Sequence, residues 1–269
     1  MTGPIRSALI VASALAMMTE RAVAQSLESR ISAARGTVGF EFTTRRNVCG
    51  TGRSISISDD TSAGWNTRTH RYGINIGRRE AGETLECEQG PARVILNREN
   101  GKVSDVRVSV GGRAERADTE LGAIPMAEAA RYLLAIAPAL AGRPAENATM
   151  GAAIADAPMD WRRMLAIARD NDATESSRKA SLFWVSQQAG AVATSGLTDV
   201  AMDNDAQASV RSDALFFLAQ RPKGEGIPGL VRVVRESKSA KLRKDAIWHL
   251  SQSRDPRALE LFEQLLSGK

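Results

Sequence analysis

Histidine and cysteine are scarce in this chain of 269 residues, which contains two of each. Zinc sites draw on several cysteine and histidine ligands at short spacings, and neither CxxC nor HxxxH occurs here. The sequence therefore excludes a conventional zinc site and indicates no cofactor. His70 and His249 are not part of any recognisable pattern of nucleophile, base and orienting group, so we expect a protein that is not an enzyme.

The N-terminus lacks an apolar run long enough to span a membrane. A spanning helix needs about 20 apolar residues, whereas Ala8–Met18 supplies eleven. This segment follows the positive charge of Arg6 and precedes a small-x-small sequence at 22–24, the pattern of a signal-peptide cleavage site. A permanent anchor is the weaker alternative at this length. We expect residues 1–24 to be a cleaved signal peptide and the mature chain to be exported, periplasmic or extracellular, without an integral membrane segment.

Positive charge is not concentrated. Lysine and arginine total 36 against 31 acidic residues, and aromatic residues make up only 4% of the chain. Nucleic-acid-binding surfaces gather basic side chains into a dense patch or stripe, whereas these are scattered. We therefore expect no nucleic-acid partner.

The two cysteines, Cys49 and Cys87, both lie in the first third of the mature chain. In an exported protein an even count permits a disulfide, and two cysteines allow a single intrachain pairing. A metal pair and two buried free thiols are the alternatives, but no ligand spacing supports a metal. The sequence favours the disulfide.

Alternating apolar residues predict β-structure around these cysteines. Val38, Phe40 and Phe42 alternate with smaller or polar residues, and the sequence at 54–57 repeats the period of two. We therefore expect residues 25–115 to form a small, mostly antiparallel β-domain.

A hairpin is predicted at Asn100-Gly101, a pair typical of tight turns between strands. A two-residue loop would place Val94 opposite Arg107, whereas a three-residue loop with a left-handed glycine would place Val94 opposite Val106. The second register keeps one face of the hairpin apolar, so the sequence favours it.

Between the predicted strands, the polar segment 58–77 contains Trp65, His70 and Tyr72. As a binding loop it would provide a ligand-binding or hydrolytic site in the β-domain. A solvated loop held by one aromatic side chain is the simpler interpretation, because acidic residues lie near His70 in sequence only.

The C-terminal part repeats itself. RKASLFWVSQ begins at Arg178, RSDALFFLAQ at Arg211 and RKDAIWHLSQ at Arg243, spaced by 33 and 32 residues. A period in this range is typical of stacked helical repeats, in which each unit buries its apolar face against the next. We therefore expect residues 116–269 to form an α-solenoid of about four helix pairs, following the β-domain in an α+β protein organised by domains.

A second helix in each unit is predicted by apolar residues at i, i+3 and i+4. The aligned positions are Met164, Leu197, Leu230 and Leu259, followed by Ile167, Val200, Val233 and Phe262. The first helix of the first unit is predicted at 126–137, with a loop and a short helix over 142–158. Asp172, Asp205 and Ser237 are predicted to cap the first helices of the other three units.

One repeat carries a family resemblance. DNDAQASVRSDALFFLAQ, from Asp203 to Gln220, resembles the short HEAT-like repeat of the phycobilisome-lyase type. The layout of the whole chain is similar to that of exported bacterial HEAT-repeat proteins. The resemblance implies an α-solenoid used for protein contacts and no defined activity, since the match lies in the generic repeat.

Two polar positions recur at the ends of the first helices. We interpret them as structural groups that hydrogen-bond the turns of the stack, and a ladder gripping an extended peptide is the alternative. They are Arg178, Arg211, Arg243, Gln187, Gln220 and Gln252.

Other positions of the second helices vary from unit to unit, as expected of a binding surface on the concave side of such an array. The candidates for contact with a protein partner are Arg169, Asp199, Met202, Arg232, Arg235 and Glu260; simple solvation is equally compatible with them. The sequence favours a non-enzymatic interaction scaffold or regulatory module of the bacterial cell envelope, with the ligand-binding or hydrolytic β-domain as the alternative.

Overall fold

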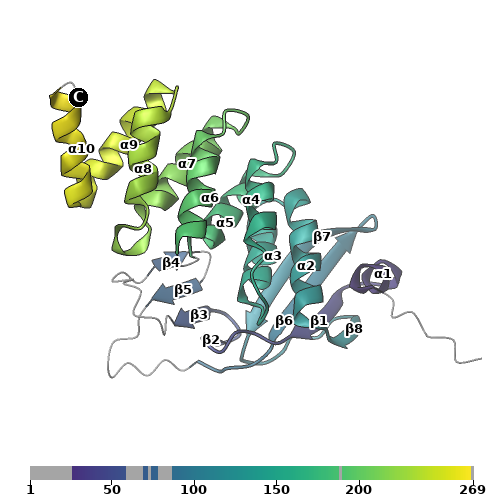
Figure 1. The fold of residues 1–269 in the computed structure, drawn as a ribbon. Helices are drawn as coiled ribbons and strands as arrows, with labels where there is room; N and C mark the ends of the chain where they lie inside the picture. Colours follow the sequence, from purple (N-terminus) through teal and green to yellow (C-terminus); the bar gives the residue numbers. More distant parts are fainter. Residues whose placement is uncertain (1–25, 59–68, 72–73, 78–86, 188–189, 268–269) are drawn as a thin grey trace, which may run out of the picture.

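The computed structural model describes residues 26–58, 69–71, 74–77, 87–187 and 190–267. Two sheets near the N-terminus are followed by a helical region that extends to the C-terminus (Figure 1). The predicted order of a β-region and then helices is confirmed. The expected signal peptide at 1–24, as well as Trp65 and Tyr72, lies outside the described residues.

The larger sheet has four strands in the order β7, β6, β1, β8. Their bounds are β1 Val38–Phe42, β6 Ala92–Glu99, β7 Lys102–Val110 and β8 Thr119–Ala123. Strand β1 is antiparallel to β6 and parallel to β8. The side chains of Phe40 and Phe42 are almost fully buried under the sheet, as their alternation in the sequence predicts.

The predicted hairpin register is wrong, for a physical reason. Strands β6 and β7 are joined by the two residues Asn100 and Gly101, both with positive φ (52° and 78°). A bulge next to Asn97 then inserts one extra residue into β7, so that Val94 faces Val108. The bulge keeps the apolar face that a two-residue loop alone would have lost.

The smaller sheet has the order β2, β3, β5, β4. Its strands are β2 Val48–Gly50, β3 Ile55–Ser58, β4 Thr69–Arg71 and β5 Ile74–Gly77. Cys49 in β2 forms a disulfide with Cys87, which confirms the predicted pairing. Gly50 and Glu88 pair beside it through two backbone hydrogen bonds of 2.9 Å, so the bond lies where two backbone segments are already held together.

Helix α1 precedes the first strand, and all the other helices follow the last strand. Their bounds are α1 Leu27–Ala33, α2 Met126–Ile136, η1 Ala137–Ala139, α3 Arg143–Ile154, α4 Trp161–Arg169, α5 Glu175–Ser186, α6 Ala191–Met202, α7 Ala208–Ala219, η2 Pro222–Gly224, α8 Ile227–Glu236, α9 Ala240–Ser253 and α10 Pro256–Leu266. Helices α3, α5, α7 and α9 pack side by side as a first layer, and α4, α6, α8 and α10 as a second layer. From α4 onward, consecutive helices pack across the two layers.

Helix α3 occupies the segment where the sequence predicted a loop and a short helix. It packs on α5 on one side and on β7 on the other, whereas α2 packs on α3. The first layer therefore begins with α3 and not with the segment 126–137. The prediction failed because α3 is built from small residues: Ala145 and Ala148 are fully buried but do not show the large apolar side chains that mark the other units.

The predicted alignment of the last helix is shifted by one residue. In α10 the side chains of Ala258 and Leu261 are 2% exposed, whereas Leu259 is 60% exposed. Leu230 and Val233 of α8 therefore correspond to Ala258 and Leu261. The sequence alignment favoured Leu259 because the other units have a large apolar residue at this position. In α10 the buried position is held by Ala258 instead.

The helix caps also differ from the prediction. Thr174 and Ser239 are the N-caps of α5 and α9, and each side chain accepts a hydrogen bond from the backbone N–H three residues later. The predicted caps lie two residues earlier. Asp170 and Asp203 instead accept backbone hydrogen bonds of 2.9 and 3.0 Å within the turns before α5 and α7.

Within the described part of the chain, every helix is too short or too polar to cross a membrane.

Replacing both cysteines with serine is expected to lower the free energy of unfolding by about 4 kcal/mol, because the disulfide closes a loop with a sequence separation of 38. Urea denaturation monitored by circular dichroism will measure the loss. The oxidised and reduced wild-type proteins are the matched controls, and equal midpoints for these two forms would contradict the expectation.

Candidate functional site

The candidate partner-contact residues all lie on helices of the second layer. Arg169 is the last residue of α4, and Asp199 and Met202 belong to α6. Arg232 and Arg235 lie on α8, and Glu260 lies on α10. Their side chains are exposed or partly exposed, and Met202 packs against the core.

Polar contacts connect each helix of this layer to the next. Arg169 pairs with Asp203 at the end of α6 at 3.3 Å, and Asp199 pairs with Arg232 of α8 at 3.6 Å. Arg235 donates to Gln264 of α10 at 2.5 Å. Residues that look independent in the sequence thus form a continuous row of charged and polar groups across four helices, which we call the second-layer face.

Glu260 and Met202 contribute differently. Glu260 accepts a hydrogen bond of 3.3 Å from Gln264 one turn later, so it extends the row along α10. The thioether of Met202 is half-buried and has no charge to add.

Arg232, the central arginine of this face, interacts with two carboxylates. Arg232 donates to Glu236 at 2.9 Å, and this hydrogen bond, with the carboxylate charges of Glu236 and Asp199, raises the pKa of the Arg232 guanidinium above its ordinary value. The group is fully charged at any physiological pH. Its pairs are exposed and so contribute little to stability, which leaves the side chains available to a partner at small cost.

A groove of about 490 Å³ runs between α6 and α8 on the same face. Gly190, Thr194, Ser195 and Thr198 line one side, and Gly229 and Arg232 line the other. A Cβ atom at Gly229 would lie 2.3 Å from the Thr198 hydroxyl oxygen. The absence of a side chain at this glycine therefore lets the two helices approach closely beneath the groove.

A buried arginine that the sequence did not single out supports the end of this groove. Arg221 follows α7, and its guanidinium donates to the carbonyl oxygens of Ser186 and Gly190 at 2.9 and 3.0 Å. It also pairs with Glu225. Burial lowers the pKa of Arg221 and the charge of Glu225 opposes that effect. Arg221 thus ties the end of α5 to the turn before α8.

The recurring arginines of the first layer contact backbone carbonyls. Arg178 is 6% exposed and donates to Ala173 and Asn171 in the turn before its own helix, and to the side chain of Gln207 in the next turn. Arg211 donates to Ala201 at 3.1 Å and Arg243 to Ser237 at 2.6 Å. Each guanidinium thus satisfies carbonyls at a helix end or inter-helix turn.

The recurring glutamines make shorter-range contacts. Gln187 is the C-cap of α5 and Gln220 that of α7, whereas Gln252 still lies inside α9. Gln187 and Gln252 each donate to the hydroxyl of the preceding serine, at 3.0 and 3.2 Å.

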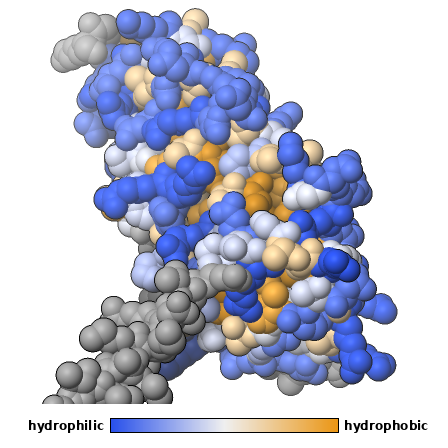
Figure 2. All heavy atoms as spheres, turned by 90° about the vertical axis from the view of Figure 1, so that its right-hand side faces the viewer, coloured by the Kyte–Doolittle hydropathy of each residue, from blue (hydrophilic) through white to orange (hydrophobic). Residues whose placement is uncertain are grey.

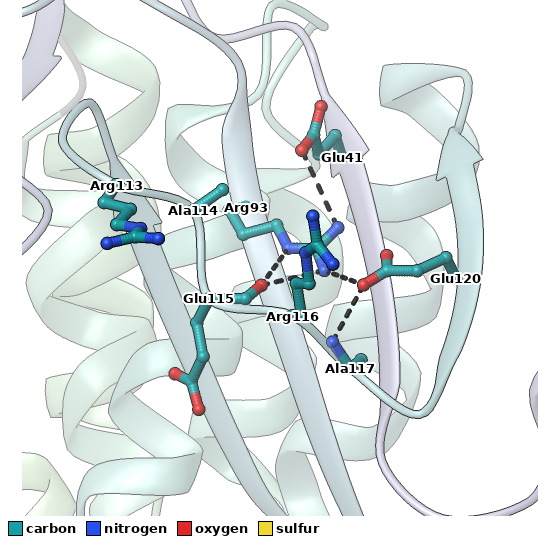
Figure 3. A pocket seen from close by; sticks show the side chains of 8 residues that line it. All are labelled: Glu41, Arg93, Arg113, Ala114, Glu115, Arg116, Ala117 and Glu120. Carbon is teal, nitrogen blue, oxygen red and sulfur yellow. Dashed lines mark hydrogen bonds and ion pairs between the residues drawn. The ribbon is translucent and has the colours of Figure 1, made fainter.

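The larger sheet carries a second site that the sequence did not indicate. A pocket of about 740 Å³ opens on the side of β1 and β6 that Arg93 faces, and the segment 113–117 forms its rim. Figure 3 shows Arg93 between Glu41 of β1 and Glu120 of β8, with Arg113 at the other end of the pocket. Arg93 donates to Glu120 at 2.5 Å and to the backbone carbonyl of Glu115 at 3.0 Å.

Arg93 has a structural task in this pocket. It lies 3.6 Å from Glu41 and lowers the pKa of Glu120 through their hydrogen bond. A Cβ atom at Gly39 would lie 2.4 Å from its guanidinium, so this glycine makes room for the arginine to cross β1. Arg93 therefore holds three strands and the 113–117 segment together.

Arg113 and Arg116 differ from Arg93 in the contacts of their side chains. Within the described part of the chain neither side chain has a hydrogen bond or an ion pair. The charge of Arg116 nevertheless contributes to lowering the pKa of Glu120. These two guanidiniums are the groups of the pocket that remain available to a ligand.

The β-domain site predicted around His70 involves side chains that lie outside the described part of the structure. Trp65 and Tyr72 lie outside the described residues, and His70 belongs to β4, of which only the backbone is described. His249 lies against Phe216, with ring centroids 6.5 Å apart, and burial lowers its pKa. Across the ranges that the structure describes, no three His, Cys, Asp or Glu side chains are grouped so as to hold a metal ion.

Figure 2 shows the face that lies on the right-hand side of Figure 1. Hydrophilic side chains cover most of it, and apolar ones gather in separate areas near its middle. Mixed surfaces of this kind are ordinary for folded proteins, so this face by itself indicates no function.

Arg178→Met is expected to destabilise the protein by about 2 kcal/mol, because it leaves the buried carbonyl of Ala173 without its donor. Arg211→Met is expected to cost less, since Arg211 is partly exposed and water can replace it. Urea unfolding of the two variants and the wild type will test this. Equal losses at both positions would contradict the difference in burial.

Comparison with known proteins gives no neighbour: no protein-family model, no curated protein and no solved structure matches this chain.

Proposed function

We propose that this chain is a non-enzymatic protein–protein interaction scaffold, or regulatory module, of the bacterial cell envelope. The observation that carries the proposal is the second-layer face, where charged and polar side chains of α4, α6, α8 and α10 form one row across successive units. A surface extended in one direction suits an elongated protein segment better than a small substrate.

A HEAT-like α-solenoid is the architecture that we propose for the helical region. The support is the pairing of neighbours within each layer, together with a sequence period of 33 and 32 residues. In such an array each unit contacts only its neighbours, so side chains on an outer face can differ between units without disturbing the core.

We propose that the protein is exported and works in the periplasm or outside the cell. The Cys49–Cys87 disulfide supports it, because disulfides persist in oxidising compartments and are rare in the cytosol.

The partner is proposed to lie along the groove between α6 and α8. A photo-crosslinking residue at Ser195, which lines the groove, is expected to give a discrete adduct in the native envelope, identifiable by mass spectrometry. Reversing the charge of Arg232 and Arg235 together is expected to reduce that adduct at least tenfold, because it turns two of the cations of the face into anions.

The matched control reverses two cations of the first layer, Lys179 and Lys241, which also take part in exposed ion pairs. It is expected to leave the adduct unchanged. A crosslinking pattern that is the same in both double variants would refute the second-layer face as the contact surface.

A second candidate function is the binding of an anionic ligand in the pocket on the larger sheet. The observation that favours it is the pair Arg113 and Arg116, which line a volume of about 740 Å³ and form no hydrogen bond or ion pair among the described residues. Guanidinium groups bind carboxylates and phosphates in bidentate fashion.

Citrate and inorganic phosphate are suitable probes for this pocket in isothermal titration calorimetry. Reversing Arg113 and Arg116 to glutamate is expected to weaken binding at least tenfold, whereas Arg131→Glu on the exposed side of α2 should not. Absence of heat with both probes in the wild-type protein would reject this function.

A further inference from the structure

The end of the helical region beyond α9 and α10 exposes residues that inner units bury. Leu182 of α5 and Leu215 of α7 are fully buried, whereas Ile247 at the equivalent position of α9 is 38% exposed. In α10, Leu259 and Leu266 are 60% and 90% exposed. This surface, which we call the end face, keeps the apolar character of an internal stacking surface.

Contacts of α9 and α10 show which way the end face points. Lys241 and His249 of α9 contact α7, and at 100° per residue Ile247 lies on the opposite side of the helix. Gln264 of α10 contacts α8, and by the same geometry Leu259 and Leu266 point away from α8. The three apolar side chains therefore share one outward surface.

Two unpaired charges of opposite sign flank this surface. Lys244 is one turn before Ile247, and Glu263 lies between Leu259 and Leu266 on the same stripe of α10. Both are exposed, and neither side chain forms an ion pair within the described ranges. An apolar centre with a basic edge on one helix and an acidic edge on the other is complementary to itself after a two-fold rotation.

We propose that the end face binds the end face of a second copy of this chain, in a two-fold symmetric dimer. Helix α9 of one protomer lies on α10 of its partner, and Lys244 of each protomer pairs with Glu263 of the other. This goes beyond the proposed scaffold function, because it uses a surface separate from the second-layer face.

Head-to-tail stacking of copies is disfavoured by the other end of the first layer. There α3 is covered by β7 and α2 of the same chain, so a second copy meets no free stacking surface of that kind. The symmetric arrangement needs only the surface that is exposed, and it closes after two copies.

The size of the end face indicates whether the dimer is permanent or reversible. Helices of 14 and 11 residues lying side by side give a surface of about 20 by 20 Å. This is below the standard size of stable interfaces and in the range of weak, transient complexes, so the dimer is expected to form reversibly.

Sedimentation velocity of the full-length purified protein, from about 1 to 300 µM, tests the dimer. Leu259→Glu is expected to raise the dissociation constant at least about 100-fold, because the buried charge occurs twice across the interface. Val192→Glu is the matched control: Val192 is 52% exposed on α6, away from the end face, and this variant is expected to dimerise normally.

Charge exchange provides the decisive variants, since Lys244 and Glu263 are exposed and their replacement leaves folding intact. Lys244→Glu and Glu263→Lys are each expected to weaken self-association at least tenfold. A mixture of the two single variants, or the double variant, is expected to restore it, because opposite charges then meet at both contacts.

A wild-type protein that stays monomeric at every concentration would overturn the proposal. So would a dimer that is indifferent to Leu259→Glu, or one that the charge exchange fails to restore, since each result would place the contact elsewhere.

Discussion

The fold depends on one helix being able to pack on two structures at once. Helix α3 lies against β7 of the larger sheet and against α5 of the first layer, and half of its buried residues are alanine, with a glycine beside them. A Cβ atom at Gly151 would lie 2.8 Å from a methyl carbon of Leu133 and 3.4 Å from one of Val108. Small side chains therefore allow the close approach that joins the two regions into one continuous core.

The same small residues explain what sequence reasoning could and could not find. The β-region, the helical repeats, the disulfide and the turn at Asn100-Gly101 follow from alternation, periodicity and local chemistry, which are visible in one sequence. The identity of α3 as a unit of the first layer is a tertiary matter, because alanine marks neither an exposed nor a buried face. The bulge in β7 is equally non-local, because it places Val108 opposite Val94 on the face of the sheet that α3 covers.

The site was predictable to a similar extent. Periodicity placed Arg232 and Asp199 on one surface, but their ion pair depends on the offset between α6 and α8, which spacing within a helix does not give. Arg93 and Arg221 were missed because nothing in the sequence distinguishes a buried arginine from a solvated one. The signals nearest to them are a glycine at 39, inside a predicted strand where larger residues are usual, and a glutamate four residues after Arg221.

The uneven depth of packing along the array has a consequence for how the protein opens. Helix α10 buries only Ala258 and Leu261, whereas α5 is buried over most of its circumference. The hydrogen bonds that join α10 to α8 and to the turn at Gly224 are exposed to solvent. Local unfolding should therefore begin at α10 and proceed inward one helix pair at a time, so that amide protons near α3 exchange only in the rare molecules that have lost the whole structure.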